Sequence, residues 1–537
     1  MTNKIEKFSL IFPDEVTQQN HYQGINRPKI DMFVLDELGL LEFFELKNSD
    51  LEEYFTTDRA VIKHRMDVFD DMLEHPEISV TLNKLIPILT DILELRRLEA
   101  DTGDNENYLE SLTEIELYIS SIETLNDGFS PIKDALKSDA LRTLAFKIAE
   151  LSESDYYKEL NIKLRELTSR VRDIKSVTIG VNLDAQLRPS SAGVLSINPE
   201  PFRSGDVIEK ILRLNFKDDE YTCIANLVPF GKKQSENQKT ALALAFNSAI
   251  NDVYRQSLRS WKRIVQTYVL ENTDFLLDLM PEIEFLVKGT ALLRKLRNGG
   301  LALCNPTIPE NGERVFCAEG LYNPCVALKV DYDIVDNDIQ MDKDNALIYV
   351  LTGPNRGGKS VITCAIGLAA SFMQLGMFVP ARNATISLCD GIFTHFPTGA
   401  DDTIDKGRLG EECARLGDIF DEVSADSIVL LDESLSSTGS FEASYIAAEV
   451  LAGFSRVGCR CLFSTHLHEL AAEIDGINSR TAPDGGVTID TLVAGIADGR
   501  RSFKIVRQKP DGKSYARDIA DKYGLSYENI VSKLQEN

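Results

Sequence analysis

The sequence predicts a multidomain protein in which a mainly α-helical core or lever region with a small β insertion precedes an α/β domain. Three observations support this fold class. Residues 56–300 hold long stretches with apolar side chains at helical spacing. Residues 176–230 interrupt them with alternating apolar residues and turn residues, which are typical of strands. From residue 301 onward, short apolar runs alternate with longer helical stretches, as in a parallel sheet covered by helices.

The clearest signal in the chain is a glycine-rich loop between a strand and a helix. The apolar run Leu347–Leu351 leads into Gly-x-x-x-x-Gly-Lys-Ser at residues 353–360, and an apolar stretch follows as far as Leu375. This order is that of a P-loop, in which backbone N–H groups and the helix N-terminus face phosphate oxygens. We expect Lys359 to reach the β- and γ-phosphates of ATP and the Ser360 hydroxyl to ligate Mg²⁺. The predicted nucleotide-binding residues are Gly353, Pro354, Asn355, Arg356, Gly357, Gly358, Lys359, Ser360 and Val361.

Two further predicted strands end in side chains suited to ATP hydrolysis. The apolar run Ile428–Leu431 is followed by Asp432 and Glu433. This arrangement predicts Asp432 as a second Mg²⁺ ligand and Glu433 as the group that orients or deprotonates the attacking water. The run Cys459–Thr465 ends at His466, which there can sense the γ-phosphate, although a lone histidine is more often an ordinary loop residue. The H-E-x-x-H order of zinc proteases is absent, so we predict no zinc site.

Together these segments resemble the ATPase domain of the MutS family. The similarity is carried by Thr352–Ser360, Leu430–Glu433 and Phe463–Leu470, with matching segments at Phe378–Ala381 and Gly399–Asp402. Other ABC-type ATPases share the general motifs. Gly-Pro-Asn inside the loop and the Ser-Thr-His-x-His-Glu-Leu string are more specific to MutS proteins.

The resemblance implies an ABC-type ATPase that uses ATP and Mg²⁺ and works as a homodimer. In the family, ATP moves helical lever arms, so double-stranded or branched DNA held between them is the implied partner. The resemblance also divides the chain into expected parts. These are an N-terminal arm with short helices at 1–55, a helical core and lever at 56–300 with a clamp-like β insertion at 176–230, the ATPase domain at 301–510, and a helical dimerisation tail at 511–537.

One tripeptide resembles the MutS mismatch reader but is not interpreted as one. Phe43 and Glu45 match the family's Phe-x-Glu pattern, in which the aromatic ring wedges beside a mispaired base. The family places that pattern in a mixed α/β domain, and no room for such a domain precedes the helical region. We therefore expect a short form of the family that lacks the N-terminal mismatch-recognition domain.

The composition points to a soluble protein of a reducing compartment. A chain of 537 residues, 43% of them hydrophobic, is long enough for several domains. No apolar run is long enough to span a membrane, and Met1–Leu10 lacks the apolar core of a signal peptide. The nine cysteines form no C-x-x-C pair, and their odd number argues against a disulfide framework. We expect a cytoplasmic protein with no membrane association.

The charge balance and one basic helix face favour different partners. Lys and Arg number 58 against 84 Asp and Glu, a net charge of −26, which argues against a protein that coats nucleic acid along its length. Arg255, Arg259, Lys262 and Arg263 nevertheless share one face of a predicted helix, where either solvent or DNA phosphates would surround them. Two hypotheses therefore remain open. One is an ATPase coupled to DNA binding in mismatch repair or in recombination and branched-DNA processing. The other is a nucleotide-gated interaction protein that acts on a protein or ribonucleoprotein partner.

Overall fold

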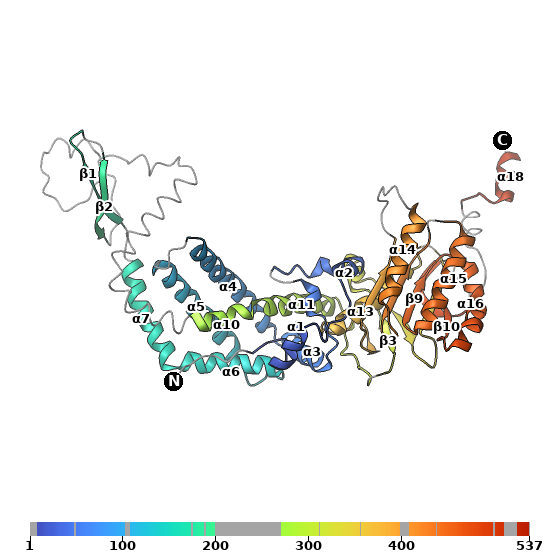
Figure 1. Cartoon of the computed structure of the whole chain (residues 1–537), viewed down its shortest axis with the longest axis horizontal. Coiled ribbons are helices and arrows are strands. Elements are labelled where there is room, and N and C mark those ends of the chain that lie inside the picture. The colour runs from blue at the N-terminus through green and yellow to red at the C-terminus, as the bar shows by residue number, and fades with distance from the viewer. Residues whose placement is uncertain are drawn as a thin grey trace. The chain divides into compact units, whose positions relative to one another are not determined.

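The computed structural model describes residues 8–47, 50–102, 108–172, 176–186, 189–198, 270–310, 312–354, 356–397, 407–436, 438–497, 500–509 and 523–535. Its contacts divide the chain into two compact units, whose elements are labelled in Figure 1. The first unit consists mainly of residues 80–136 and 142–280. The second consists of residues 8–79, 137–141 and 281–537.

In its described residues, the first unit is built from helices and one hairpin. The elements that form it, wholly or in part, are α4 (Pro76–Thr102), α5 (Tyr108–Phe129), α6 (Asp139–Glu153), α7 (Asp155–Arg172), β1 (Ser176–Leu183), β2 (Pro189–Asn198) and α10 (Leu270–Asp278). Helices α4 and α5 approach closely, because a Cβ on Gly128 would lie 2.0 Å from the Thr81 Oγ1. Arg96 of α4 forms ion pairs with Glu114 of α5, at 2.7 Å, and with Asp274 of α10. Close packing and charge together therefore join these three helices.

The described N-terminal part of the second unit consists of helices, three of which have an aspartate N-cap. Its elements are α1 (Glu15–Tyr22), α2 (Met32–Glu37), η1 (Leu41–Phe43), η2 (Leu51–Tyr54), α3 (Arg59–Glu74) and, later in the chain, α11 (Met280–Asn298). Asp14, Asp31 and Asp58 each accept a backbone hydrogen bond from the first turn of α1, α2 and α3 respectively, which favours helix initiation at these points. Arg65 of α3 is fully buried, and its Nε donates to the Ile11 carbonyl oxygen at 3.1 Å. This bond fastens the N-terminal segment to α3.

The rest of the second unit is an α/β domain. Its elements are β3 (Phe316–Leu321), α12 (Pro324–Lys329), β4 (Asn337–Met341), β5 (Ile348–Thr352), α13 (Lys359–Gln374), β6 (Asn383–Ile386), β7 (Ile392–His395), α14 (Gly407–Glu422), β8 (Ile428–Asp432), α15 (Ser440–Val457), β9 (Arg460–Ser464), α16 (His468–Thr481), η5 (Ala482–Asp484), β10 (Ile489–Ala497), β11 (Arg500–Arg507) and α18 (Tyr527–Gln535). The main sheet has six strands in the order β11-β10-β5-β9-β8-β7. Strands β10, β5, β9, β8 and β7 run parallel, and β11 is antiparallel to β10. A second, three-stranded antiparallel sheet has the order β4-β3-β6.

Helices cover the main sheet on both faces, which explains why its central strands are buried along their whole length. Every residue of β5, β8 and β9 is buried, as expected for strands covered on both sides. Helices α14, α15 and α16 share one apolar core with these strands. In Figure 1, α13 lies on the other side of the strands from α15 and α16. The multidomain prediction of helices followed by mixed sheets is confirmed at this level.

The beginning of the chain extends the edge of the main sheet. The Lys29 N–H donates to the Asp390 carbonyl oxygen at 2.7 Å, and the Ile392 N–H donates to the Lys29 carbonyl oxygen at 3.1 Å. These two bonds form a parallel bridge between Lys29 and Gly391 at the outer edge of β7. An edge strand exposes unpaired backbone groups, and here residues from the N-terminal segment cover the start of that edge.

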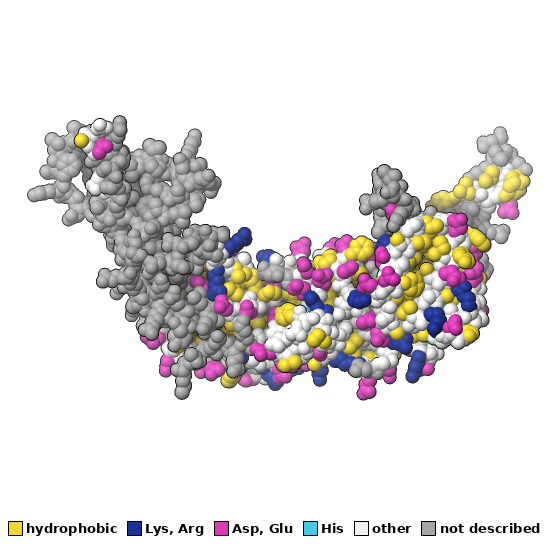
Figure 2. Space-filling model, in the orientation of Figure 1, with side chains coloured by type: hydrophobic (Ala, Val, Ile, Leu, Met, Phe, Trp, Pro, Cys, Tyr) yellow, Lys and Arg dark blue, Asp and Glu magenta, His cyan; other side chains and the backbone are white. Residues whose placement is uncertain are grey.

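The face of the described residues drawn in Figure 2 is mixed in polarity and in charge. On the face shown in Figure 2, acidic and basic side chains of the described residues lie interspersed with hydrophobic ones. Within the part of the chain that the structure describes, no helix is both long and apolar enough to cross a membrane.

Candidate active site

The glycine-rich loop adopts a backbone that requires glycine at its first position. Strand β5 ends at Thr352 and α13 begins at Lys359, so the loop lies between a buried strand and a helix N-terminus, as the sequence predicts. Gly353 has φ +138°, and a Cβ there would lie 2.8 Å from the Ala494 Cβ and 3.1 Å from the Ala494 backbone nitrogen. Arg356 is a non-glycine residue with φ +58°. Asn355 lies outside the described residues.

Lys359 points into the interior of this loop. Its side chain is buried, and its Nζ donates to the carbonyl oxygens of Gly353 at 3.3 Å and Pro354 at 3.4 Å. The Nζ also lies 3.5 Å from each ring nitrogen of His466. Burial lowers the pKa of Lys359, and the nearby carboxylates of Glu433 and Asp432 oppose that shift. The ammonium group is therefore shielded from water. It lies where the sequence predicts a contact with phosphate oxygens.

Asp432 ends β8 as a buried carboxylate. Burial raises its pKa, while the hydroxyls of Ser360 and Ser464 lie near enough to lower it. Its Oδ1 is buried and has no hydrogen-bond partner within the described part of the chain. A carboxylate oxygen without a partner beside a serine hydroxyl suits a hard cation such as Mg²⁺. Ser360 and Asp432, the two predicted metal ligands, therefore fit the ion and lie side by side.

Glu433 and His466 meet at the tips of adjacent strands. The Glu433 N–H donates to the Ser464 carbonyl oxygen at 2.8 Å, and His466 Nε2 lies 2.7 Å from Glu433 Oε1. Glu433 has φ +50°, so its carboxylate leaves the strand direction and faces the histidine. The structure therefore brings together the three side chains predicted to act in hydrolysis, which are Lys359, Glu433 and His466.

A pocket of about 470 Å³ opens beside the loop. Its lining residues come from the end of β3, from α12 and the segments on either side of it, from β4, from the loop and α13, from the turn after β8, and from β11. They are Leu321, Tyr322, Asn323, Val326, Val330, Asp333, Ile334, Val335, Asn337, Arg356, Gly357, Gly358, Lys359, Ser360, Val361, Ile362, Ala365, Glu433 and Phe503. Val361 and Val335 are each 39% exposed. The pocket thus joins a polar end, at the loop, to an apolar end suited to a nucleoside.

Phe503 is a member of this pocket that sequence reasoning missed. It lies on β11 with φ +56° and is 45% exposed. The Asn337 side chain holds β11 in place through two hydrogen bonds. Its Nδ2 donates to the Phe503 carbonyl oxygen at 3.1 Å, and its Oδ1 accepts from the Ile505 N–H at 2.7 Å. A Cβ built on Gly358 would lie 3.7 Å from the Phe503 ring. No local pattern in the sequence marks Phe503, since its position depends on a partner strand more than 160 residues earlier.

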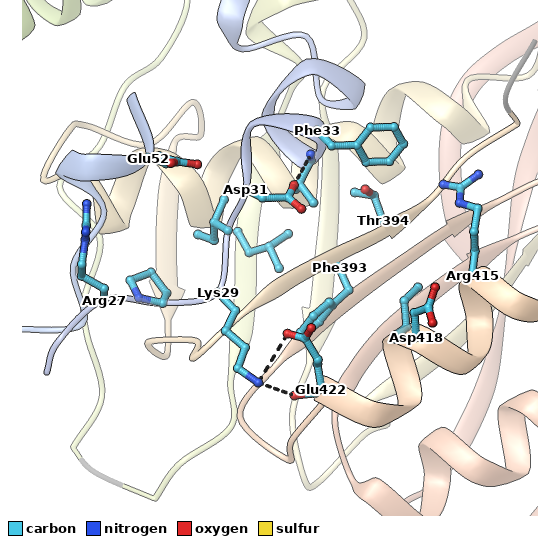
Figure 3. Close-up of a pocket in the computed structure, with 15 residues that line it drawn as sticks. Arg27, Lys29, Asp31, Phe33, Glu52, Phe393, Thr394, Arg415, Asp418 and Glu422 are labelled. Atoms are coloured by element: carbon cyan, nitrogen blue, oxygen red, sulfur yellow. Dashed lines mark hydrogen bonds and ion pairs between the residues drawn. The ribbon is translucent and has the colours of Figure 1, made fainter. Parts of the chain in front are cut away.

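A second hollow of about 560 Å³ lies at the edge of the main sheet (Figure 3). The segment 27–34, strand β7 and helix α14 line it, with Glu52 at its margin. Lys29 crosses it to form an ion pair with Glu422 at 3.5 Å. The predicted basic face at Arg255, Arg259, Lys262 and Arg263 lies outside the described residues. That face stays a prediction.

Comparisons with known proteins cover both parts of the chain. MutS domain V matches residues 349–525, which include every predicted catalytic, metal and nucleotide-binding residue, and the MutS2 N-terminal domain matches residues 57–299. The DNA mismatch repair protein MutS of Fervidobacterium nodosum is 26% identical over 89% of this chain and 58% of its own length. The DNA mismatch repair protein spellchecker 1 of Drosophila melanogaster is 24% identical over 89% of this chain and 54% of its own length. A shorter match, 36% identical over 38% of this chain and 22% of the relative, is to DNA mismatch repair protein MutS 1 of Haloarcula marismortui. The chain spans about half the length of the relatives that match it along most of its own length.

Proposed function

Because this chain belongs to the MutS family, we propose that it binds ATP with Mg²⁺, hydrolyses ATP as a dimer and couples its nucleotide state to DNA binding. One observation carries the proposal. Lys359, Asp432, Glu433 and His466 meet where the adjacent parallel strands β5, β9 and β8 end, beside a pocket with one polar and one apolar end. Mismatch repair is the activity that the printed names of the relatives favour, and the processing of branched DNA is the alternative within the same proposal.

The chemistry of this site is direct attack of water on the γ-phosphate. Glu433 takes a proton from the water, and the contact with His466 orients its carboxylate. Lys359 stabilises the charge that develops on the phosphate oxygens. Mg²⁺, when bound at Ser360 and Asp432, supplies further positive charge beside the β- and γ-phosphates. His466 contacts both Lys359 and Glu433, so it links the phosphate-binding loop to the base.

The apolar end of the pocket receives the base of the nucleotide. Phe503 offers the one aromatic ring near Gly358 among the described lining residues, and Val335 lines the same pocket. A ring and a branched aliphatic side chain can hold a flat purine between them.

The experiment that tests the proposal is the ATPase rate of the purified protein with duplex, mismatched, branched and single-stranded DNA, at low and at physiological salt. The proposal predicts hydrolysis that one DNA form stimulates. The stimulated rate should disappear in Glu433→Gln. Light scattering with and without ATP tests whether the active species is a homodimer. A protein without ATPase activity under any of these conditions would overturn the proposal.

The acidic charge balance favours a second candidate function. A net charge of −26 suits a nucleotide-gated interaction protein whose target is a protein or a ribonucleoprotein. Replacing Arg255, Arg259 and Arg263 by Glu separates the two functions, because only the DNA-coupled ATPase loses salt-sensitive DNA binding. A double Glu replacement of Lys295 and Arg297, which are exposed on α11, is the control for loss of positive charge alone. For either candidate we propose a cytoplasmic location, which the free thiols of the eight described cysteines support.

A further inference from the structure

The turn that follows β8 has an unfavourable backbone. Glu433 has φ +50° and Leu435 has φ +64°, and both values fall in the left-handed region that residues with a Cβ disfavour. Ser434 lies between them, and both Ser434 and Leu435 are buried. Two such residues within three positions persist only where other parts of the structure hold them. The turn therefore depends on contacts from outside itself.

Two residues, His395 and Glu412, supply those contacts. The Ser434 hydroxyl oxygen lies 2.7 Å from Nδ1 of His395 and 3.0 Å from the His395 carbonyl oxygen. The Leu435 N–H donates to Oε2 of Glu412. One contact thus comes from the last residue of β7 and the other from α14. Both residues that follow Glu433 in the turn are held by polar groups.

The His395 ring is itself fixed from both sides. It is buried, and its Nε2 lies 3.2 Å from the Glu412 carbonyl oxygen. A carbonyl oxygen only accepts hydrogen bonds, so Nε2 carries the hydrogen and Nδ1 faces Ser434. Burial lowers the pKa of His395, in agreement with a neutral ring. The ring cannot turn without losing a bond to one of its two neighbours.

A third contact joins the two elements that carry these residues. Nη1 of Arg415 on α14 donates to the Phe396 carbonyl oxygen at 3.2 Å, one residue beyond β7. The Arg415 guanidinium also lies 5.5 Å from the centre of the Phe33 ring and 3.4 Å from Glu37. Figure 3 shows Arg415 and Phe33 at the rim of the second hollow. His395 and Glu412 therefore project from elements that are held to each other.

We propose that His395 and Glu412 are positioning residues for ATP hydrolysis. They hold the turn at 433–435 so that the Glu433 carboxylate faces the attacking water, and neither touches the nucleotide. This inference rests on the proposed function. Without these contacts the turn would relax toward the right-handed backbone, and the Glu433 carboxylate would leave its place beside His466. Binding of ATP would remain, because the phosphate loop joins β5 to α13, whereas these contacts involve β7, α14 and the turn after β8.

The test measures kcat, KM for ATP and the affinity for a non-hydrolysable ATP analogue in matched variants of the full chain. Ser434→Ala and His395→Leu remove the contact from either side, and Glu412→Ala removes the acceptor for the Leu435 N–H. We expect kcat to fall roughly 10- to 100-fold, because misplacement by about 1 Å has effects of that size, while analogue affinity changes less than about twofold. His395→Asn and Glu412→Gln keep one polar atom at the contact and should recover much of kcat. Asp421→Ala, an exposed change on the same helix, is the control.

The outcomes separate this inference from the proposed function. Wild-type protein that does not hydrolyse ATP overturns both. Active wild-type protein whose kcat is unchanged in Ser434→Ala and Glu412→Ala overturns the inference alone. A loss that appears equally in Asp421→Ala, or that lies in analogue affinity rather than in kcat, also overturns it. Ser434→Ala removes a single oxygen atom, so it tests the contact even where His395→Leu does not fold.

Discussion

Nε2 of His466 lies 2.7 Å from Oε1 of Glu433, and Nζ of Lys359 lies 3.5 Å from the same histidine nitrogen. One imidazole ring, after β9, thus contacts a side chain that follows β8 and one from the start of α13. The histidine therefore touches both the lysine that we propose binds phosphate and the glutamate that we propose activates water. Arrival of a γ-phosphate at Lys359 would therefore alter the contacts of the base directly.

Replacing the proposed base should separate binding from hydrolysis. In Glu433→Gln the side chain keeps its size and its contact with His466 but cannot accept a proton. We expect the ATPase rate to fall by about 100-fold or more, as for loss of a general base, with ATP still bound. Glu473→Gln, an exposed change on α16, is the control. Normal hydrolysis in Glu433→Gln would show that another group acts as the base.

A methyl group at the first loop glycine should weaken nucleotide binding. In Gly353→Ala the new Cβ would lie 2.8 Å from the Ala494 Cβ, at a φ of +138° that alanine disfavours. We expect a fluorescent ATP analogue to bind at least tenfold more weakly, which corresponds to about 1.4 kcal/mol. Gly417→Ala is the matched control, since a Cβ there meets nothing within 4 Å. Equal affinities of the two variants would contradict this account of the loop.

Removing the aromatic ring at 503 should weaken nucleotide affinity without slowing the chemical step. Phe503→Ala deletes the ring beside Gly358, and we expect roughly a fivefold to tenfold loss of affinity, the size of a single aromatic contact. Phe503→Tyr should retain most of the affinity. Val506→Ala changes a residue on the same strand that is 42% exposed and serves as the control. A change in kcat at saturating ATP would assign Phe503 a different role.

Stability should fall as pH rises through the range in which Glu282 ionises. Burial raises the pKa of Glu282 from its ordinary 4.5 to about 7, against hydrogen bonds from Ser9 and Leu10. The folded protein therefore binds more protons than the unfolded chain between these pH values. The stabilisation is complete below about pH 4.5 and is lost up to about pH 7, by about 3 kcal/mol in the free energy of unfolding.

Urea unfolding at several pH values, with Glu282→Gln for comparison, measures this effect. The side chain of the variant does not titrate, so the difference between wild type and variant isolates Glu282. This subtraction matters because burial lowers the pKa of His21 to about 4, which removes stability as pH falls from about 6.5 toward 4. Glu313→Gln, at an exposed position, is the control. A difference that does not vary with pH would mean that Glu282 ionises normally in the folded protein.

The parts of the site that could be predicted are those in which chemistry follows directly from local order. A glycine-rich loop after a strand, and carboxylates directly after an apolar run, show from the sequence alone that these residues lie at the ends of strands. Lys359, Asp432 and Glu433 lie accordingly where their neighbours along the chain place them. The broad fold could be predicted for the same reason, because helical spacing and buried strands are local patterns.

Phe503 and His395 could not be predicted, because their roles arise from distant pairing. Phe503 reaches the pocket through a hairpin clamped by Asn337, and His395 meets Ser434 only because β7 lies next to β8 in the sheet. Neither side chain belongs to a recognisable pattern. The basic face around Arg259 stays a prediction, since it lies outside the described residues.

The bridge between Lys29 and Gly391 has a consequence for biosynthesis. The second unit is assembled from residues 8–79, 137–141 and 281–537, so its first segment leaves the ribosome long before its sheet exists. Chains are translated from the N-terminus, and segments that await their partners expose apolar surface. Nascent chains halted before strand β7 should therefore present residues 8–79 to chaperones and proteases. In the folded unit, apolar side chains of this segment such as Leu10, Leu35 and Leu40 are buried.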